Sequence, residues 1–266
     1  MIMNEGQPHQ TLWIREKKTQ ESLLELIGEE PLSIRVQGNP YAVIMRTSGN
    51  EIAHAAGFCL GEGLVDSLDD FGGIAYCEDD VNVVTVTVTP ERKKKVQTLL
   101  LRQGYTSQTS CGICGKALIE DMVSHISKVV SPVSMSSHLI RSELSQLSSH
   151  QPLRDRTRAS HGAVLFGCEG NFLASGEDVG RHNALDKVVG KLFLDKRLHE
   201  AALLIMSSRI SYELVQKAAR AKIPIIAALS RPTALAVKLS QRLNITLVCA
   251  DGKNGLYVFS GHQRVQ

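Results

Sequence analysis

The stretch "AALLIMSSRISYELVQKAARAKIPIIAALSRPTALAVKLSQRLNITLVCADGKNG", residues 201–255, decides the fold. Three of its runs are apolar throughout, "AALLIM", "IPIIAAL" and "ITLVC", and helical stretches around residues 211–221 and 233–242 separate them. Such runs are typical of strands buried on both faces, and helices between them indicate right-handed crossovers in a parallel sheet. The run "AVLF" and a helical stretch over 182–195 come before them. We therefore expect a three-layer α/β domain over residues 161–266.

The chain upstream shows a different pattern, which predicts a smaller α+β subdomain over residues 21–130. Alternating apolar runs at 32–36 and 41–45 flank turn residues, so they predict a hairpin. "GNEIAHAAGFCLGEGL" at 49–64 has helical spacing. Two β-branched runs follow, "GIAYC" and "VNVVTVTVTP", and then a second helical stretch, "ERKKKVQTLLLRQG".

Two segments outside these domains are predicted to be irregular. Residues 1–20 are polar and lack a clear period, so we expect a loose N-terminal tail. Residues 131–160 begin with eight serines in twenty residues and continue into the basic loop "QPLRDRTRASH", which predicts a linker. Within it, Ile140, Leu144 and Leu147 have the spacing of a short amphipathic helix.

Composition and charge exclude several classes of protein. Lys and Arg total 30 against 27 Asp and Glu, a formal net charge of +3, which is too small a surplus to indicate a nucleic-acid partner. No apolar run approaches the roughly 20 residues of a membrane helix, and the N-terminus lacks the order of a signal peptide. We expect a cytoplasmic protein without a membrane partner. Four cysteines stand singly in the sequence and are expected to be buried apolar residues, namely Cys59, Cys77, Cys168 and Cys249.

The loops that follow the predicted strands are candidates for a ligand site, because open α/β sheets bind ligands outside the carboxyl ends of their strands. Three such loops carry hydroxyls or cations: "SSR" at 207–209, which includes Arg209, "SRP" at 230–232, and "ADGKNG" at 250–255, which includes Lys253. The first two lead into helices, whose N-terminal N–H groups bind anions. Together they predict a site for a phosphate-bearing ligand, although each loop alone is also consistent with ordinary turn chemistry.

A second polar stretch, "GEDVGRHNALDK" at 176–187, begins the helix predicted at 182–195. It places an acid pair between Gly176 and Gly180 and a cation and an imidazole directly after Gly180, which is consistent with a compact binding turn that includes Arg181 and His182. A capped helix with solvated charges is the structural alternative.

The pair Cys111 and Cys114 in "TSCGICGK" is the strongest chemical signal. Structural zinc needs a second pair of ligands, and a zinc deaminase needs H-x-E, and the sequence contains neither. We expect no metal. A thioredoxin-like dithiol remains possible, because the following helix and Lys116 would stabilise a thiolate. The flanking glycines favour a mobile nucleophile that accepts sulfur as a persulfide.

Six motifs together resemble the FdhD proteins, the formate dehydrogenase accessory sulfurtransferases. In order along the chain, they are "EEPLSIRVQG" (29–38), "MRTSGNEIAHAAGFCLGEGL" (45–64), "SCGICGK" (110–116), "EDVGRHNALDKVVG" (177–190), "SSRISYELVQKAA" (207–219) and "ITLVCADGKNGLYVF" (245–259). The series covers nearly the whole chain from about residue 28.

The resemblance implies a cytidine-deaminase-like three-layer α/β domain with a smaller N-terminal subdomain, in a chain that is often a homodimer. It also implies transfer of persulfide sulfur from a cysteine desulfurase to the molybdenum cofactor, in its bis-molybdopterin guanine dinucleotide form, before insertion into formate dehydrogenase. Cys111 looks like the persulfide carrier and Cys114 its partner. A non-catalytic cofactor-binding chaperone is the alternative. The residues expected to contact the cofactor are Ala250, Asp251, Gly252, Lys253, Asn254, Gly255, Arg209, Arg181 and His182.

Overall fold

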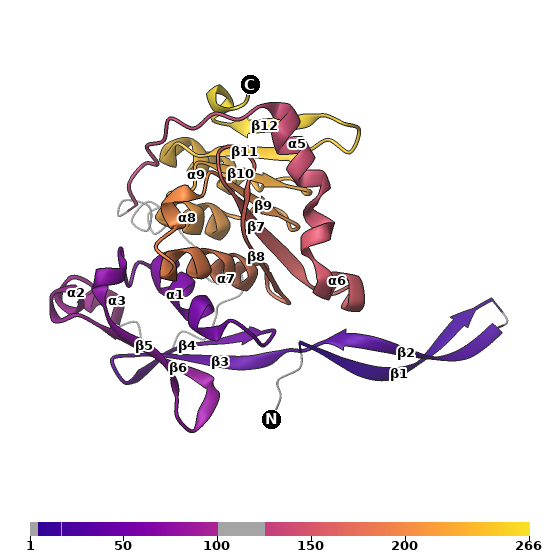
Figure 1. Cartoon of the computed structure of the whole chain (residues 1–266), viewed down its shortest axis with the longest axis horizontal. Helices are drawn as coiled ribbons and strands as arrows, with labels where there is room; N and C mark the ends of the chain where they lie inside the picture. The colour runs from indigo at the N-terminus through magenta and orange to yellow at the C-terminus, as the bar shows by residue number, and fades with distance from the viewer. Residues whose placement is uncertain (1–4, 17, 101–125) are drawn as a thin grey trace.

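The computed structural model describes residues 5–16, 18–100 and 126–266 of the chain (Figure 1). These residues form three sheets of two, four and six strands, with helices packed around the largest sheet. No helix in these ranges is long and apolar enough to cross a membrane.

The largest sheet has the strand order β12-β11-β10-β9-β7-β8. Its strands are β7 (His161–Phe166), β8 (Phe172–Asp178), β9 (Leu203–Met206), β10 (Ile225–Ala228), β11 (Thr246–Ala250) and β12 (Leu256–Ser260). Strands β9, β10 and β11 are parallel, as predicted. The prediction of a wholly parallel sheet is wrong, because β7 runs antiparallel to β8 and β9, and β12 runs antiparallel to β11.

A tight turn between β7 and β8 explains the reversed strand. The Gly167 N–H donates to the carbonyl of Asn171 at 2.9 Å, and Gly170 has a φ of +81°, a value that favours glycine. The chain therefore doubles back at once instead of crossing over through a helix. As a result, the start of β7 and the end of β8 lie at the same edge of the sheet as the carboxyl ends of β9, β10 and β11.

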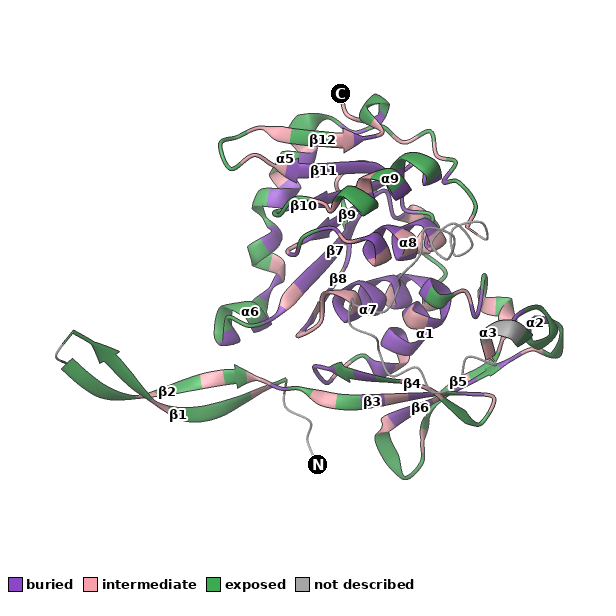
Figure 2. Ribbon diagram, turned by 180° about the vertical axis from the view of Figure 1, so that it is seen from behind, coloured by how far each residue is buried: buried purple, intermediate pink, exposed green. Residues whose placement is uncertain are grey.

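Helices cover both faces of this sheet, so the predicted three-layer arrangement is confirmed (Figures 1 and 2). Side chains from successive residues of a strand point to opposite faces. Leu204 and Ile226 accordingly belong to one apolar core, and Leu203 and Ile225 to the other. The first core is covered by α1 (Glu51–Glu62), α7 (Arg181–Leu194), α8 (Tyr212–Arg220) and α9 (Ala234–Leu243), and the second by α5 (Ser137–Ser145).

The segment 131–160 is part of the third layer, so the expected linker is not found. Ile140, Leu144 and Leu147 are buried against the sheet, which confirms the short amphipathic helix. One of the serines that suggested a linker caps this helix, because the Ser136 hydroxyl accepts the Leu139 N–H at 3.1 Å. A further short helix, α6 (Pro152–Thr157), follows.

The N-terminal half forms a four-stranded sheet in the order β4-β3-β6-β5. Its strands confirm the predicted hairpin and the two β-branched runs: β3 (Glu30–Val36), β4 (Asn39–Arg46), β5 (Phe71–Cys77) and β6 (Asp80–Val88). Helices α2 (Pro90–Lys95) and α3 (Gln97–Leu100) follow β6, and four 3₁₀ turns lie at Leu68–Asp70, Leu147–His150, Leu198–Glu200 and His262–Arg264. Buried residues of this sheet belong to the same core as α7 and α8.

A long hairpin stands where a loose tail was predicted for residues 1–20. Strands β1 (Gly6–Arg15) and β2 (Lys18–Ile27) pair antiparallel and project from the body of the molecule (Figure 1). Trp13 and Leu12 are exposed on it. Its apolar side chains lie on both faces of the hairpin, and no core covers them. The sequence therefore lacks the strict alternation of apolar and polar residues from which a half-buried strand is predicted. Arg156 of α6 holds its base through an ion pair with Glu25 at 3.1 Å.

Candidate functional site

Helices α1 and α7 cross at two glycines, and this crossing fixes the start of α7 against the sheet. A Cβ on Gly190 would lie 1.7 Å from the Ala53 carbonyl oxygen, and one on Gly57 would lie 2.0 Å from that of Asp186. Only glycine permits so close an approach of two helix backbones. Beside this crossing, the Lys217 ammonium donates to both oxygens of buried Asp186, at 2.9 and 2.8 Å.

Asp178, at the end of β8, connects the two halves of the chain. Its carboxylate accepts the Thr47 N–H at 3.1 Å and the Asn183 amide at 2.8 Å, and it pairs with Lys187 at 2.7 Å. Lys187 also donates to the Thr47 carbonyl at 2.7 Å. Asp178, Asn183 and Lys187 are all buried. These members of the predicted binding turn therefore hold the fold together and do not face a ligand.

Glu177 has a similar structural role. Its carboxylate accepts the backbone N–H groups of Leu153 and Arg154, at 2.7 and 2.9 Å, and the hydroxyl of Ser160 at 2.5 Å. A carboxylate at the first turn of a helix satisfies N–H groups that have no partner within the helix. Glu177 thereby anchors α6 to the edge of the sheet.

His182 and Arg181 of the same turn do reach the carboxyl edge of the sheet. His182 Nε2 lies 2.6 Å from Glu213 Oε2 and 3.4 Å from the Ser211 hydroxyl, both at the start of α8. The hydrogen bond from His182 lowers the pKa of Glu213. The Nε atom of Arg181 is buried and has no hydrogen-bond partner among residues 5–16, 18–100 and 126–266. The N-termini of α7 and α8 thus present an imidazole, a carboxylate and a guanidinium side by side.

His161, at the start of β7, adds a second imidazole to this edge. Burial lowers the pKa of His161, and the nearby cations of Arg181 and Arg154 lower it further. A half-buried imidazole that stays neutral can accept a proton from a bound group or donate an N–H hydrogen bond to one. Its position follows from the antiparallel direction of β7, which sequence reasoning missed.

The loop after β9 also lies at the carboxyl edge, and it carries the exposed cation Arg209. The Ser207 hydroxyl accepts the Gly162 N–H at 2.9 Å and so ties β7 to β9. Arg209 is exposed and has no ion-pair partner among the described residues. Of the predicted "SSR" loop, Arg209 is therefore the member that is free to meet an anion.

The predicted loop at 250–255 closes on its own aspartate. The Asp251 carboxylate accepts the N–H groups of Lys253 and Gly255, at 2.6 and 2.7 Å, and these bonds lower its pKa. Arg141 of α5 donates to the carbonyl of Asn254. Gly252 and Asn254 have positive φ, and the Lys253 side chain is exposed. Asp251 therefore shapes the loop, and Lys253 is its outward cation.

Between these two loops, the loop after β10 carries Arg231 and contacts β11 and β12. The Arg231 guanidinium lies over the ring of Tyr257, 5.4 Å from its centroid. The Cys249 thiol donates to the carbonyl of Ser230 at 3.1 Å, and burial raises the pKa of this thiol to about 11. Cys249 is thus a poor nucleophile at neutral pH.

The predicted catalytic pair, Cys111 and Cys114, lies outside the described residues. The described chain stops at Leu100 and resumes at Ile126, and both of these residues pack against the larger core. The prediction for the other cysteines is confirmed for Cys59 and Cys249, which are buried. It is wrong for Cys168, which is exposed because it lies in the turn between β7 and β8, and Cys77 is only partly buried at the end of β5.

Sequence reasoning missed three residues of this edge, His161, Ser211 and Glu213. From the sequence, a glutamate in the first turn of a helix is explained by its favourable interaction with the helix dipole, and Ser211 is explained as an N-cap. Neither Glu213 nor Ser211 therefore indicated a binding site. A helix that begins directly after a cationic loop at the carboxyl end of a strand was the available signal for both. Within the described ranges, no group of three or more His, Cys, Asp or Glu residues could hold a metal ion.

The edge therefore combines three helix N-termini with cations that have few partners, in a three-layer α/β fold. The model of the FdhD/NarQ family matches residues 27–266, and the chain belongs to this family.

Curated relatives align along most of the chain. The sulfur carrier protein FdhD of Mycolicibacterium paratuberculosis is 38% identical over 248 residues, which cover 90% of this chain and 91% of that protein. The sulfur carrier protein FdhD of Streptomyces avermitilis is 37% identical over 251 residues, which cover 90% and 88%. A crystal structure from Desulfotalea psychrophila, described as a formate dehydrogenase accessory protein, has a TM-score of 0.78 at 23% identity and covers 99% of this chain and 100% of that one. It supports the fold.

Proposed function

We propose that this chain is a sulfur carrier that passes persulfide sulfur from a cysteine desulfurase to the molybdenum cofactor, in its bis-molybdopterin guanine dinucleotide form, before insertion into formate dehydrogenase. The observation that carries the proposal is membership of the family, with relatives named as sulfur carrier proteins along 90% of the chain. The sequence supplies the C-x-x-C pair that such a carrier needs. We place the protein in the cytoplasm as a homodimer, and light scattering of the purified chain tests the dimer.

In the loading step, the Cys111 thiolate attacks the outer sulfur of the desulfurase persulfide. A new S–S bond forms on Cys111 as the S–S bond of the donor breaks, and the donor cysteine leaves as its thiolate. The proton of the transferred –SH remains with that sulfur, so no external oxidant or reductant is required. Cys114 lies three positions along the chain, where it can assist in holding or releasing the sulfur.

The carboxyl edge of the sheet is the proposed binding site for the molybdenum cofactor, which is the cargo of the carrier. The guanine dinucleotide arms of the cofactor carry pyrophosphates, and helix N-termini with unpaired cations bind such groups. Arg181, Arg209, Arg231 and Lys253 supply the cations around this edge, and the His182–Glu213 pair lies between α7 and α8. These contacts would hold the cargo without covalent chemistry.

Intact-mass measurement tests the sulfur-carrying step. After incubation with a cysteine desulfurase and cysteine, the wild-type chain is expected to gain sulfur that a reducing agent removes. Cys111→Ala is expected to abolish this gain. Cys168→Ala is the matched control, because Cys168 is an exposed single cysteine outside the site. If Cys111→Ala gains as much sulfur as the control, the assignment of Cys111 is wrong.

A non-catalytic chaperone is the second candidate, and the carboxyl edge favours it, because its cations are present without any contribution from the cysteines. In this case the chain would bind and protect the cofactor only. Expression of Cys111→Ala in cells that lack the native protein separates the two functions. Restored formate dehydrogenase activity would support the chaperone, and absent activity with intact cofactor binding would support the carrier.

Equilibrium binding of GDP tests the cargo site directly. Arg209→Ala and Lys253→Ala are each expected to weaken binding about tenfold, because a hydrogen bond to a charged group contributes roughly 1.5–3 kcal/mol. Lys238→Ala is the matched control, since Lys238 is exposed on α9 away from the strand ends. Equal affinity for all three variants and the wild type would remove the edge as the site.

A further inference from the structure

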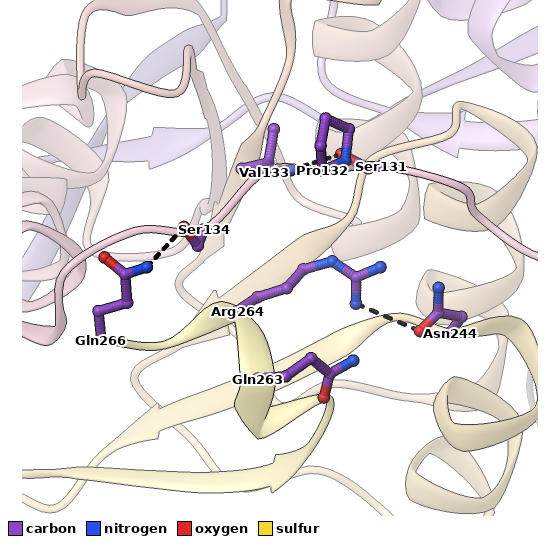
Figure 3. Close-up of a pocket in the computed structure, with 8 residues that line it drawn as sticks. All are labelled: Ser131, Pro132, Val133, Ser134, Asn244, Gln263, Arg264 and Gln266. Carbon is purple, nitrogen blue, oxygen red and sulfur yellow. Dashed lines mark hydrogen bonds between the residues drawn. The ribbon is translucent and has the colours of Figure 1, made fainter.

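A polar cavity lies at the other end of β11 from the 250–255 loop (Figure 3). Its volume is about 410 Å³. The segment 131–134 lines one side of the cavity. The other side is lined by Asn244, which comes just before β11, and by Gln263, Arg264 and Gln266. The carboxyl edge proposed for the cargo begins beyond Ala250, so the two sites lie at opposite ends of the same strand.

Among the described residues that line this cavity, Arg264 has the only charged side chain, and no carboxylate of the described ranges pairs with it. The residue is 4% exposed, and its buried Nε atom has no hydrogen-bond partner in the part of the chain that the structure describes. Its remaining bonds both come from Nη1, to Asn244 at 3.4 Å and Thr246 at 3.5 Å, which are long for hydrogen bonds. Burial alone lowers the pKa of the guanidinium, and no carboxylate of the described chain offsets this.

A buried cation without a counter-ion is uncommon, because desolvation of a charge is costly unless an opposite charge or several hydrogen bonds compensate. The other buried Arg and Lys side chains of the described chain have such partners: Arg46 pairs with Glu51, Arg92 with Asp66, Lys187 with Asp178 and Lys217 with Asp186. Arg264 differs from them in facing a cavity. A bound anion would provide the missing compensation.

The rest of the lining selects the kind of anion. Apart from Pro132 and Val133, it consists of hydroxyls and side-chain amides, with Ser131, Ser134, Gln263 and Gln266 around the guanidinium. Gln266 donates to the Ser134 hydroxyl at 2.9 Å, whereas the exposed Gln263 side chain makes no bond to another described residue. Donors of this type, around one guanidinium, suit the oxygens of a phosphate or carboxylate. The volume falls within the range of roughly 300–1,000 Å³ that is usual for small-molecule sites.

We propose that this cavity binds the phosphate or carboxylate group of a small organic molecule, with Arg264 as its buried counter-ion. The site is separate from the carboxyl edge, because no residue of that edge lines the cavity. Ser131 and Ser134 belong to the chain that leaves Val129, which is itself hydrogen-bonded to Leu243 and Asn244. A bound oxyanion would therefore join this segment to the C-terminal turn.

Thermal unfolding and calorimetry of the full chain test the proposal with three probes, inorganic phosphate, sulfate and citrate. At least one is expected to bind saturably and to raise the melting temperature. Preference for phosphate would indicate a phosphate ester, and preference for citrate would indicate a carboxylate. Arg264→Gln is expected to weaken binding at least tenfold, and Arg242→Gln, which removes an exposed arginine near the same end of the sheet, is expected to bind normally.

A second variant keeps the test decisive if Arg264→Gln fails to fold. Gln263→Glu places a carboxylate at the rim, so it is expected to raise the melting temperature without any added anion and to abolish the response to phosphate, sulfate and citrate. The proposal is overturned if no probe binds the wild type saturably. It is also overturned if Arg242→Gln loses as much affinity as Arg264→Gln, or if Gln263→Glu responds to the probes as the wild type does.

Discussion

The junction between α1 and α7 and the carboxyl edge of the sheet share the segment 177–187. The charged side chains of the junction are buried and paired, whereas cations of the edge are exposed. In the junction, Asp178 and Lys187 are buried and lie 2.7 Å apart. At the edge, Arg209 and Lys253 are exposed and have no ion-pair partner among the described residues. Stretches of sequence that are rich in polar residues therefore have two different roles in this protein. Some form a buried framework of ion pairs, and others form an exposed surface that is proposed to bind a ligand.

Asp186→Asn should cause the largest loss of stability, because it removes the buried counter-ion of the Lys217 ammonium and leaves only the partly exposed Glu62 carboxylate, 3.7 Å away. The free energy of unfolding is expected to fall by about 3–5 kcal/mol. Urea unfolding followed by far-UV circular dichroism measures it. The double variant Asp186→Leu/Lys217→Met removes both charges and should cost much less. If the single and double variants are equally destabilised, packing and not charge explains the loss.

Gly190→Ala should cause the next largest effect. The new Cβ would lie 1.7 Å from the Ala53 carbonyl oxygen, so α1 and α7 must separate. The expected cost is roughly 2–3 kcal/mol, the upper part of the range for overpacked cores. Gly73→Ala is the matched control, because nothing lies within 4 Å of the Cβ position there. A melting temperature unchanged by Gly190→Ala would show that the helices cross less closely than described.

His54 should make the junction sensitive to acid. Burial, and then the cations of Lys187 and Lys217, hold the pKa of His54 well below its usual 6.5. Because the unfolded chain takes up this proton first, the contribution of His54 to stability is constant above about pH 6.5 and falls as the pH drops below it, by up to about 1.4 kcal/mol per pH unit. Asp186, whose pKa burial raises to about 6, acts in the opposite direction over the same range. Unfolding free energies between pH 5 and 7 measure this slope.

His54→Leu should make that slope shallower, whereas His138→Leu, on the exposed face of α5, should leave it unchanged. Part of the slope should remain in His54→Leu, because burial also lowers the pKa of His161 and acts in the same direction. An identical slope in wild type and His54→Leu would contradict the assignment.

Glu213→Gln should have the smallest effect on stability, because the His182–Glu213 pair lies at the open edge. Both side chains are partly exposed, and such pairs contribute less than about 1 kcal/mol. The lowered pKa of Glu213 means that this contribution is present above about pH 4.5 and is lost as the pH falls through the folded pKa. A loss of several kcal/mol at pH 7 would instead place Glu213 in the structural framework.

The repeated strands and helices of residues 201–255 were predictable because burial on both faces leaves a plain apolar signal. Strand β8 was missed because "FLASGED" includes small and polar residues whose partners lie elsewhere in the chain. The three loops of the edge were predictable from strand direction alone. The structural role of Asp178 was not, because its partner Thr47 lies 131 positions away in the sequence. Periodicity contains no information about such distant pairs.

The β1–β2 hairpin determines how these experiments can be followed. Trp13 is the only tryptophan of the chain, and it is half-exposed on this projecting ribbon, away from both apolar cores. Its fluorescence would therefore change little when the core unfolds, so circular dichroism is the appropriate probe of stability. The same emission would shift to shorter wavelength when another surface covers the hairpin. The fluorescence of Trp13 would thus report when another surface binds to the hairpin, and it would respond little to unfolding of the core.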